Sequence, residues 1–190
     1  ARHWHRIKAG FLPVFAFTLL SGVATILHWD SFNHSHISFY AWAGLSFTTP
    51  FIILATWMTN RYEDPLFPEK GEIITSYGLR RFFGAVCAVT LVVGAVLFLA
   101  PHLLINVWPG DLTPLSARVV AAMFSLPGVL GLELAFETRW SAARGILQAQ
   151  ASSIFLILVA AVISHEDFTP GLAAWLFNDG LALILLGIIT

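Results

Sequence analysis

The stretch Asp111-Leu-Thr-Pro114 occurs a second time as Asp167-Phe-Thr-Pro170, and an alanine follows each proline by three residues. Each copy lies between two long apolar segments. A weaker first copy begins at Asp30, where a few polar residues delay the next apolar segment. An aspartate-bearing turn between two apolar helices makes a helical hairpin. The sequence therefore predicts three hairpin repeats, at about residues 10–58, 80–136 and 143–190.

The composition of the chain is that of a protein in a lipid bilayer. Its 190 residues are 57% hydrophobic and 11% charged, whereas a soluble domain is about 25% charged. Water could not hold such a surface in solution, so we expect an integral membrane protein. The formal net charge of −1 gives no reason to expect a nucleic-acid partner. The single cysteine, Cys87, can form no disulfide within the chain.

Six apolar segments are long enough to cross a membrane, since a spanning helix needs about 20 apolar residues. Backbone that faces lipid must be helical, because its polar groups have no water to bind. We therefore expect an all-α fold, a single polytopic domain of six transmembrane helices over residues 1–190. The expected helices lie at about 10–29, 37–58, 80–105, 114–136, 143–165 and 170–190.

The repeated turn contains the signals that start a helix. Thr113 and Thr169 are suited to the N-cap, and Pro114 and Pro170 to the first helical position. The aspartate just before each threonine places an anion near the positive end of the helix dipole. The repeat thus predicts that a new helix begins at each proline.

Basic residues predict the orientation of the chain. They gather before the first helix, between the second and third helices and between the fourth and fifth helices, with only Arg118 near the opposite side. Positive loops face the cytoplasm, so we expect both chain ends to be cytoplasmic, in a bacterial plasma membrane. The three aspartate turns would then face outward.

Asp179 is the sharpest candidate site. It lies in Asn178-Asp-Gly180, about 13 Å into the expected last helix. An acid at this depth is costly and indicates a proton relay, a cation site or a polar partner. Two structural alternatives stand beside this hypothesis. The Asn-Asp-Gly sequence could break the apolar run, so that the membrane-spanning part starts later. Alternatively, Asp179 could be protonated and hydrogen-bonded to Gln148, Gln150 or Ser152. The intramembrane polar candidates that accompany Asp179 are Asn178, Gln148 and Gln150.

A metal site is a second hypothesis for the outer face. Imidazole and carboxylate groups bind zinc, and the candidate ligands are His34, His36, Asp30 and Asp167. The chain has no fixed-spacing metal signature, and histidine is common in interfacial loops.

A third hypothesis concerns haem or chlorophyll-type pigments, whose axial ligands are often histidines on spanning helices. His28, His102 and His165 all lie near the outer ends of expected helices. Histidines that bind such pigments usually lie deeper in the membrane. The composition of the chain implies lipid as a bound molecule.

Two prolines inside expected helices, Pro50 and Pro127, predict kinks with a freed carbonyl group. Thr48 and Thr49 could satisfy the carbonyl near Pro50, which favours a packing role. The inverted symmetry typical of many secondary transporters is absent.

The chain has no phosphate-binding loop, zinc-protease motif, nucleophile elbow or redox Cys pair, so enzymatic activity is not expected. The leading hypothesis is a non-catalytic accessory or scaffolding subunit of a larger membrane complex, with other membrane subunits as partners. One alternative is a small transporter or proton/cation pathway that uses Asp179. Another is a haem, pigment or metal carrier that uses the outer histidines.

Overall fold

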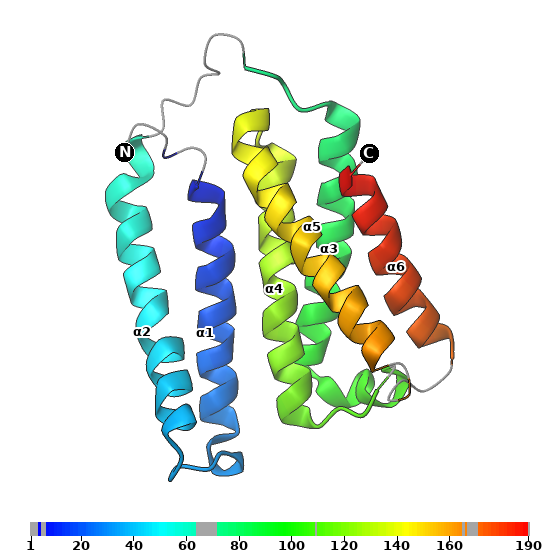
Figure 1. Cartoon of the computed structure of the whole chain (residues 1–190). Coiled ribbons are helices and arrows are strands. Elements are labelled where there is room, and N and C mark those ends of the chain that lie inside the picture. Colours follow the sequence, from blue (N-terminus) through cyan, green and yellow to red (C-terminus); the bar gives the residue numbers. More distant parts are fainter. Residues whose placement is uncertain are drawn as a thin grey trace.

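The computed structural model describes residues 4, 7–63, 72–108, 110–164, 166 and 171–189. Their α-helices run alternately in opposite directions (Figure 1). The helices are α1 (Phe11–Leu27), α2 (Ile37–Asn60), α3 (Tyr77–Leu99), α4 (Pro114–Phe136), α5 (Trp140–Ile163) and α6 (Leu172–Ile189).

Five of these helices are long and apolar enough to cross a membrane. Counted with adjoining 3-10 turns, they are Lys8–Leu27, Ile37–Glu63, Tyr77–Leu99, Pro114–Phe136 and Trp140–Ile163. The last helix contributes a shorter apolar stretch, Ala174–Ile189. The all-helical, membrane-compatible fold class is therefore confirmed. The sixth span and the repeat relation among the hairpins stay predictions.

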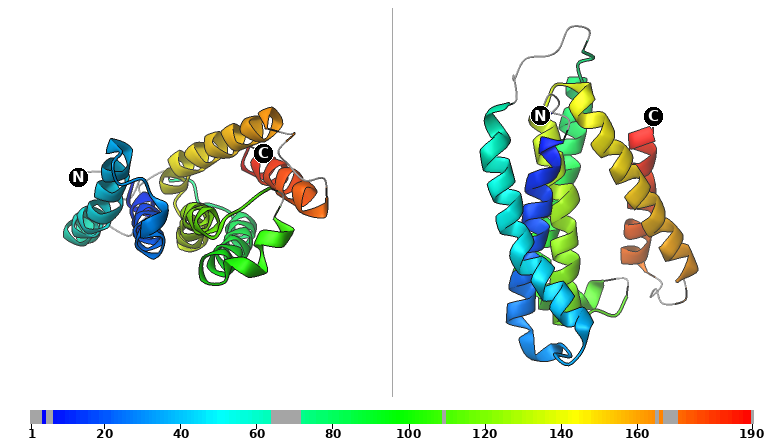
Figure 2. Two further views of the ribbon diagram at one scale, coloured as in Figure 1. Left: turned by 90° about the horizontal axis from the view of Figure 1, so that it is seen from below. Right: turned by 60° about the vertical axis from the view of Figure 1, so that its left-hand side comes forward.

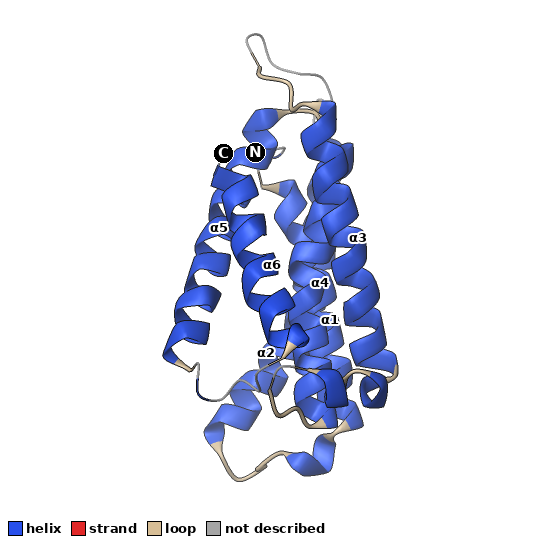
Figure 3. Ribbon diagram, turned by 90° about the vertical axis from the view of Figure 1, so that its right-hand side faces the viewer, coloured by secondary structure: helices blue, strands red, loops and turns tan. Residues whose placement is uncertain are grey.

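The loops gather at the two ends of the bundle, as Figure 3 shows. We name the end where α1, α3 and α5 begin the N-terminal end. The turns that contain Asp30 and Asp111 follow α1 and α3, so both lie at the opposite end.

Helix α4 holds the bundle together, because it packs extensively against both α1 and α3. Helix α2 packs on α1, and α5 packs mainly on α6 (Figure 2). Glycines on the α3–α4 face let the two backbones approach closely. A Cβ atom at Gly128 would lie 2.6 Å from the Leu91 side chain, and one at Gly131 would collide with the Cys87 sulfur.

Two clusters of buried side chains form the core. The cluster at the N-terminal end joins α3, α4 and α5 through Phe83, Leu130, Leu134, Ala143 and Leu147. The cluster at the opposite end joins only α3 and α4, through Leu97, Ala117 and Ala121. Helix α5 is thus held to the core near its beginning.

The two ends of α3 differ from the predicted range of 80–105. The helix begins at Tyr77, because the Ser76 hydroxyl caps the Leu79 amide at 3.3 Å. It ends at Leu99, because Pro101 disfavours helical backbone at the residue before it. Two 3-10 turns follow, Pro101–Leu103 and Ile105–Val107.

The predicted start of α4 is confirmed. Pro114 takes the first helical position, and the Thr113 hydroxyl accepts a hydrogen bond from the Ser116 amide at 3.1 Å. The corresponding prediction for Thr169 and Pro170 lies outside the described residues.

The proline inside α2 has a different environment from the one we expected. The Thr48 hydroxyl donates to the Gly44 carbonyl at 2.6 Å, so it does not satisfy the carbonyl that Pro50 frees. That carbonyl belongs to Ser46, and it lies against Gly22 of α1. The freed group therefore faces a close helix–helix contact.

Candidate functional site

Asp179 lies on an unbroken helix. Residues 178–180 belong to α6, which continues from Leu172 to Ile189. The Asn-Asp-Gly sequence therefore does not interrupt the helix, and the point at which its membrane-spanning part begins stays a prediction. The carboxylate lies seven residues after the start of α6, about 10 Å along its axis.

The side chain of Asp179 is exposed on the outward face of α6. Its neighbours on this face are apolar and equally open, with Trp175 68%, Leu176 66% and Leu183 67% exposed. Asp179 makes no hydrogen bond or ion pair with any residue that the structure describes. Among the described residues, the acid therefore has no partner, and it lies on an otherwise apolar face of α6.

Asn178 points elsewhere, because successive residues on a helix differ by about 100°. It is half-buried, and its Oδ1 atom has no hydrogen-bond partner within the described residues. The adjacent Phe177 ring lies 6.1 Å from that of Trp108, in the connection between α3 and α4. Asn178 and Asp179 therefore do not act on one common ligand position.

The polar residues of α5 do not pair with Asp179. The Ser152 hydroxyl donates to the Gln148 carbonyl at 2.9 Å. Gln148 is exposed and Gln150 is half-buried. A shallow cavity of about 340 Å³ is lined by Ser141, Arg144, Gly145 and Gln148. These side chains lie along the first turns of α5, away from the acid on α6.

This geometry bears on the proposed ion pathway. A pathway through one chain would need Asp179 to face other polar groups inside the bundle. Asp179 faces outward instead, so such a pathway would need a second chain to enclose it.

His28, a predicted pigment ligand, is engaged with another side chain. Its Nε2 atom lies 2.6 Å from an Nη1 donor of Arg118, whose Nε donates to the Phe98 carbonyl at 3.1 Å. The guanidinium thus links the ends of α1, α3 and α4. Burial, and then the charge of Arg118, lower the pKa of His28 below its ordinary value. Arg118 is the only basic residue that the sequence analysis found near the side opposite the basic loops. Its isolated position is the sequence feature that could have indicated this contact.

The other histidines singled out from the sequence have separate surroundings. His34 is packed between the rings of Trp29 and Phe39, with centroid distances of 5.0 and 4.6 Å. The His36 Nδ1 atom accepts a hydrogen bond from the Ser38 amide at 3.3 Å and caps α2. His102 is exposed in the turn after α3.

The described part of the chain contains no cluster of side chains that supports the metal hypothesis. In that part, no group of three or more His, Cys, Asp or Glu side chains is placed to hold a metal ion. Asp30 is exposed, and Asp167 and His165 lie outside the described residues. The metal and pigment assignments stay predictions.

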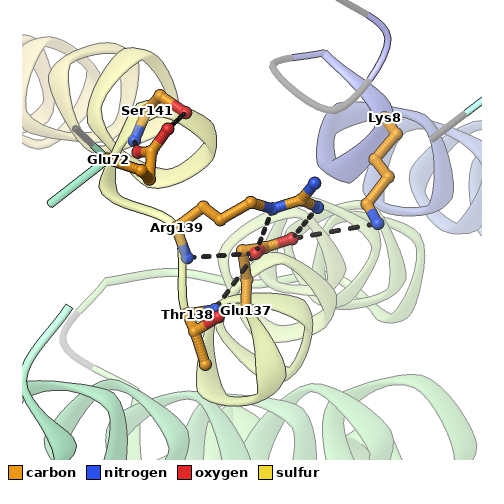
Figure 4. Close-up of polar contacts among 6 residues, drawn as sticks. All are labelled: Lys8, Glu72, Glu137, Thr138, Arg139 and Ser141. Carbon is orange, nitrogen blue, oxygen red and sulfur yellow. Dashed lines mark hydrogen bonds and ion pairs between the residues drawn. The ribbon is translucent and has the colours of Figure 1, made fainter. Parts of the chain in front are cut away.

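Sequence reasoning missed a polar junction at the N-terminal end, which Figure 4 shows. The Glu137 carboxylate follows α4 and accepts from the Thr138 amide and from the amide, Nε and Nη2 of Arg139, at 2.8–3.1 Å. The Lys8 ammonium lies 3.8 Å from it. Burial alone would raise the pKa of Glu137, but its bonds to Arg139 and the charges of Arg139 and Lys8 lower it.

A second carboxylate ties the predicted cytoplasmic loop to this junction. Glu72 accepts from the Ser141 amide and hydroxyl at 2.8 and 2.9 Å. Two backbone hydrogen bonds, Thr75 to Thr138 and Trp140 to Ile73, continue the contact at 2.8 and 2.9 Å. Residues 72–75 are thus fastened to the connection between α4 and α5.

The two polar regions differ in character. The junction at the N-terminal end is fully engaged in contacts within the chain, so its evident role is to fix the helix ends. The carboxylate of Asp179 is not engaged by any described residue, so it is the group best placed to meet something outside the chain. Comparison of the chain with protein-family models, curated proteins and solved structures finds no match.

Proposed function

We propose that the chain is an integral, non-catalytic subunit of a larger membrane complex, and that the α5–α6 pair packs against its partner. The observation that carries this proposal is the packing of α5. Ala142, Ala143 and Leu147 are buried in its first turns, but only Ile154 is buried in the rest of the helix. Of the apolar stretch in each helix, 17% is buried in α5, compared with 22% in α2 and in α3, 33% in α1 and 39% in α4.

Lipid tails are as apolar as the helix surfaces, so the hydrophobic effect does not drive helices together in a membrane. Close packing between the helices holds them together instead. The second half of α5 has few such contacts with α1–α4, although it belongs to a bundle with a well-packed centre. A partner helix against this half would supply the packing that the chain itself lacks. The short connections and the absence of a catalytic motif agree with a role in assembly.

The test is the mass of the native particle after mild extraction into polymer nanodiscs. We expect a particle larger than the 20.9 kDa chain, with a second polypeptide in fixed ratio. Leu156→Trp on α5 should release the partner. Leu45→Trp on α2 should not, although Leu45 is as exposed as Leu156, at 66% and 65%. A lone monomer in the wild-type preparation would contradict the proposal.

A further inference from the structure

We propose that the outward face of α6 binds a membrane helix of a different protein, which carries a lysine or arginine level with Asp179. This inference rests on the proposed function and names the chemistry of the partner. It is drawn from three features of α6: the spacing of its exposed residues, the unpaired acid and the absence of basic residues.

The exposed residues form one stripe. Leu176, Asp179 and Leu183 follow one another by three and then four residues, and Trp175 flanks them. Side chains at this spacing lie on one helix face and pack between the side chains of a facing helix. A single polar residue within such a stripe fixes the register of the two helices. The face therefore has the pattern of a helix-binding surface, with Asp179 at its centre.

The carboxylate specifies what the facing helix must offer. An acid within the hydrocarbon is costly when alone, and such groups pair with opposite charges or hydrogen-bond donors. No described residue supplies a partner to Asp179. An ammonium or guanidinium group at the same depth would neutralise the charge and form a charge-assisted hydrogen bond.

A second copy of the chain does not meet this requirement. Two copies in the same orientation would bring their α6 helices together about a twofold axis, with one Asp179 opposite the other. Helix α6 contains no lysine or arginine that could neutralise the two carboxylates. A symmetric contact through α6 is therefore not complementary, and the partner that we propose is another protein.

The experiment uses the full chain in liposomes with synthetic transmembrane helices as probes. The probes are polyleucine peptides that carry lysine, glutamine or leucine at the depth of Asp179. Association is measured by energy transfer between dyes on the chain and the peptide. We expect the lysine peptide to associate about tenfold more tightly than the leucine peptide. Asp179→Leu should remove this preference, and Asp179→Asn should transfer part of it to the glutamine peptide.

Cross-linking locates the contact. In a Cys87→Ala background, Leu183→Cys should form a disulfide with a cysteine in the lysine peptide. Leu45→Cys, on α2, should not, although Leu45 and Leu183 are 66% and 67% exposed. Equal association of lysine and leucine peptides would overturn the inference. So would cross-linking of two chains through Leu183→Cys in preference to the peptide.

The result can be separated from that of the proposed function. If the native complex survives Asp179→Leu, the proposed subunit role stands and the proposed charge-paired contact at Asp179 is contradicted. A wild-type chain that is extracted as a monomer would remove the subunit role, while the peptide assay would still report on the α6 face. Because Asp179 is exposed, its variants should keep the thermal stability of the wild type, which is measured first.

Discussion

Gly131 of α4 lies against Cys87 of α3, and among the described glycines it is the one at which an added methyl group would meet the shortest contact. Its replacement by alanine would drive Cβ into the Cys87 side chain. We expect Gly131→Ala to lower the free energy of unfolding by about 1–3 kcal/mol, as overpacking of a tight core does. Thermal unfolding in detergent, followed by circular dichroism, measures the change.

Gly44→Ala is the matched control, because nothing lies within 4 Å of the Cβ position at Gly44 in α2. That substitution should leave stability unchanged or raise it by up to about 1 kcal/mol. Equal losses in the two variants would contradict the close contact between α3 and α4.

His28 gives the bundle a dependence on pH. Its pKa in the folded chain is below the ordinary 6.5, so the folded state favours the neutral ring that accepts from Arg118. The unfolded state therefore binds the proton more readily. Stability should be complete above about pH 6.5 and should fall as the pH drops through the lowered pKa.

His28→Gln keeps an acceptor for Arg118 but has no proton to gain in this range. Its unfolding temperature, measured between pH 5 and 8, should vary less with pH than that of the wild type. The same pH profile in both proteins would show that His28 is not the titrating group.

At the scale of the helices, the sequence predicts best where local signals are strong. The range predicted for α4 matches the structure, because Thr113 and Pro114 mark its start. The predicted end of α3 was six residues too late, because apolar side chains continue past Leu99 although Pro101 stops the helix. Apolar runs alone do not reveal such an end.

The candidate site was predictable only in part, because local sequence signals do not show how the helices pack. Asp179 is conspicuous in sequence, but α6 is apolar around its whole circumference, so no periodicity shows which way the acid points. The Glu72–Ser141 contact joins residues 69 positions apart, and neither belongs to a recognisable motif. Both features follow from tertiary packing.

The contact between Glu72 and Ser141 should control the order of residues 72–75. We expect Glu72→Ala to speed hydrogen exchange at the Thr75 amide, because the bond from that amide to Thr138 depends on the same attachment. The loss of unfolding free energy should be about 1.5–3 kcal/mol, as for other hydrogen bonds to a charged group.

Ser141→Ala removes the hydroxyl contact and leaves the bond from the Ser141 amide to Glu72. It should therefore have a smaller effect on the same amide. Unchanged protection of Thr75 in Glu72→Ala would show that the loop is held by other contacts.

For the whole molecule, the basic residues predict that the N-terminal end faces the cytoplasm. In a Cys87→Ala background, a membrane-impermeant maleimide should label Asp30→Cys and Glu166→Cys in intact cells. It should label Tyr62→Cys, at the N-terminal end, only after lysis. A fluorescent reporter fused after the last residue should be cytoplasmic if α6 crosses the membrane.

Labelling of Asp30→Cys and Glu166→Cys from different sides would contradict an even number of crossings between them. A reporter on the outer side would leave the chain with five crossings and would contradict the six-span prediction.

The central place of α4 has a consequence for synthesis. Helices leave the ribosome in chain order, and α4 is the fourth to enter the bilayer. Until then, α1 and α3 both lack the helix against which each of them packs extensively. The nascent chain must therefore keep α3 near the insertion machinery until α4 has been inserted. A ribosome that stalls earlier leaves α3 without its main packing partner, whereas α1 still has α2.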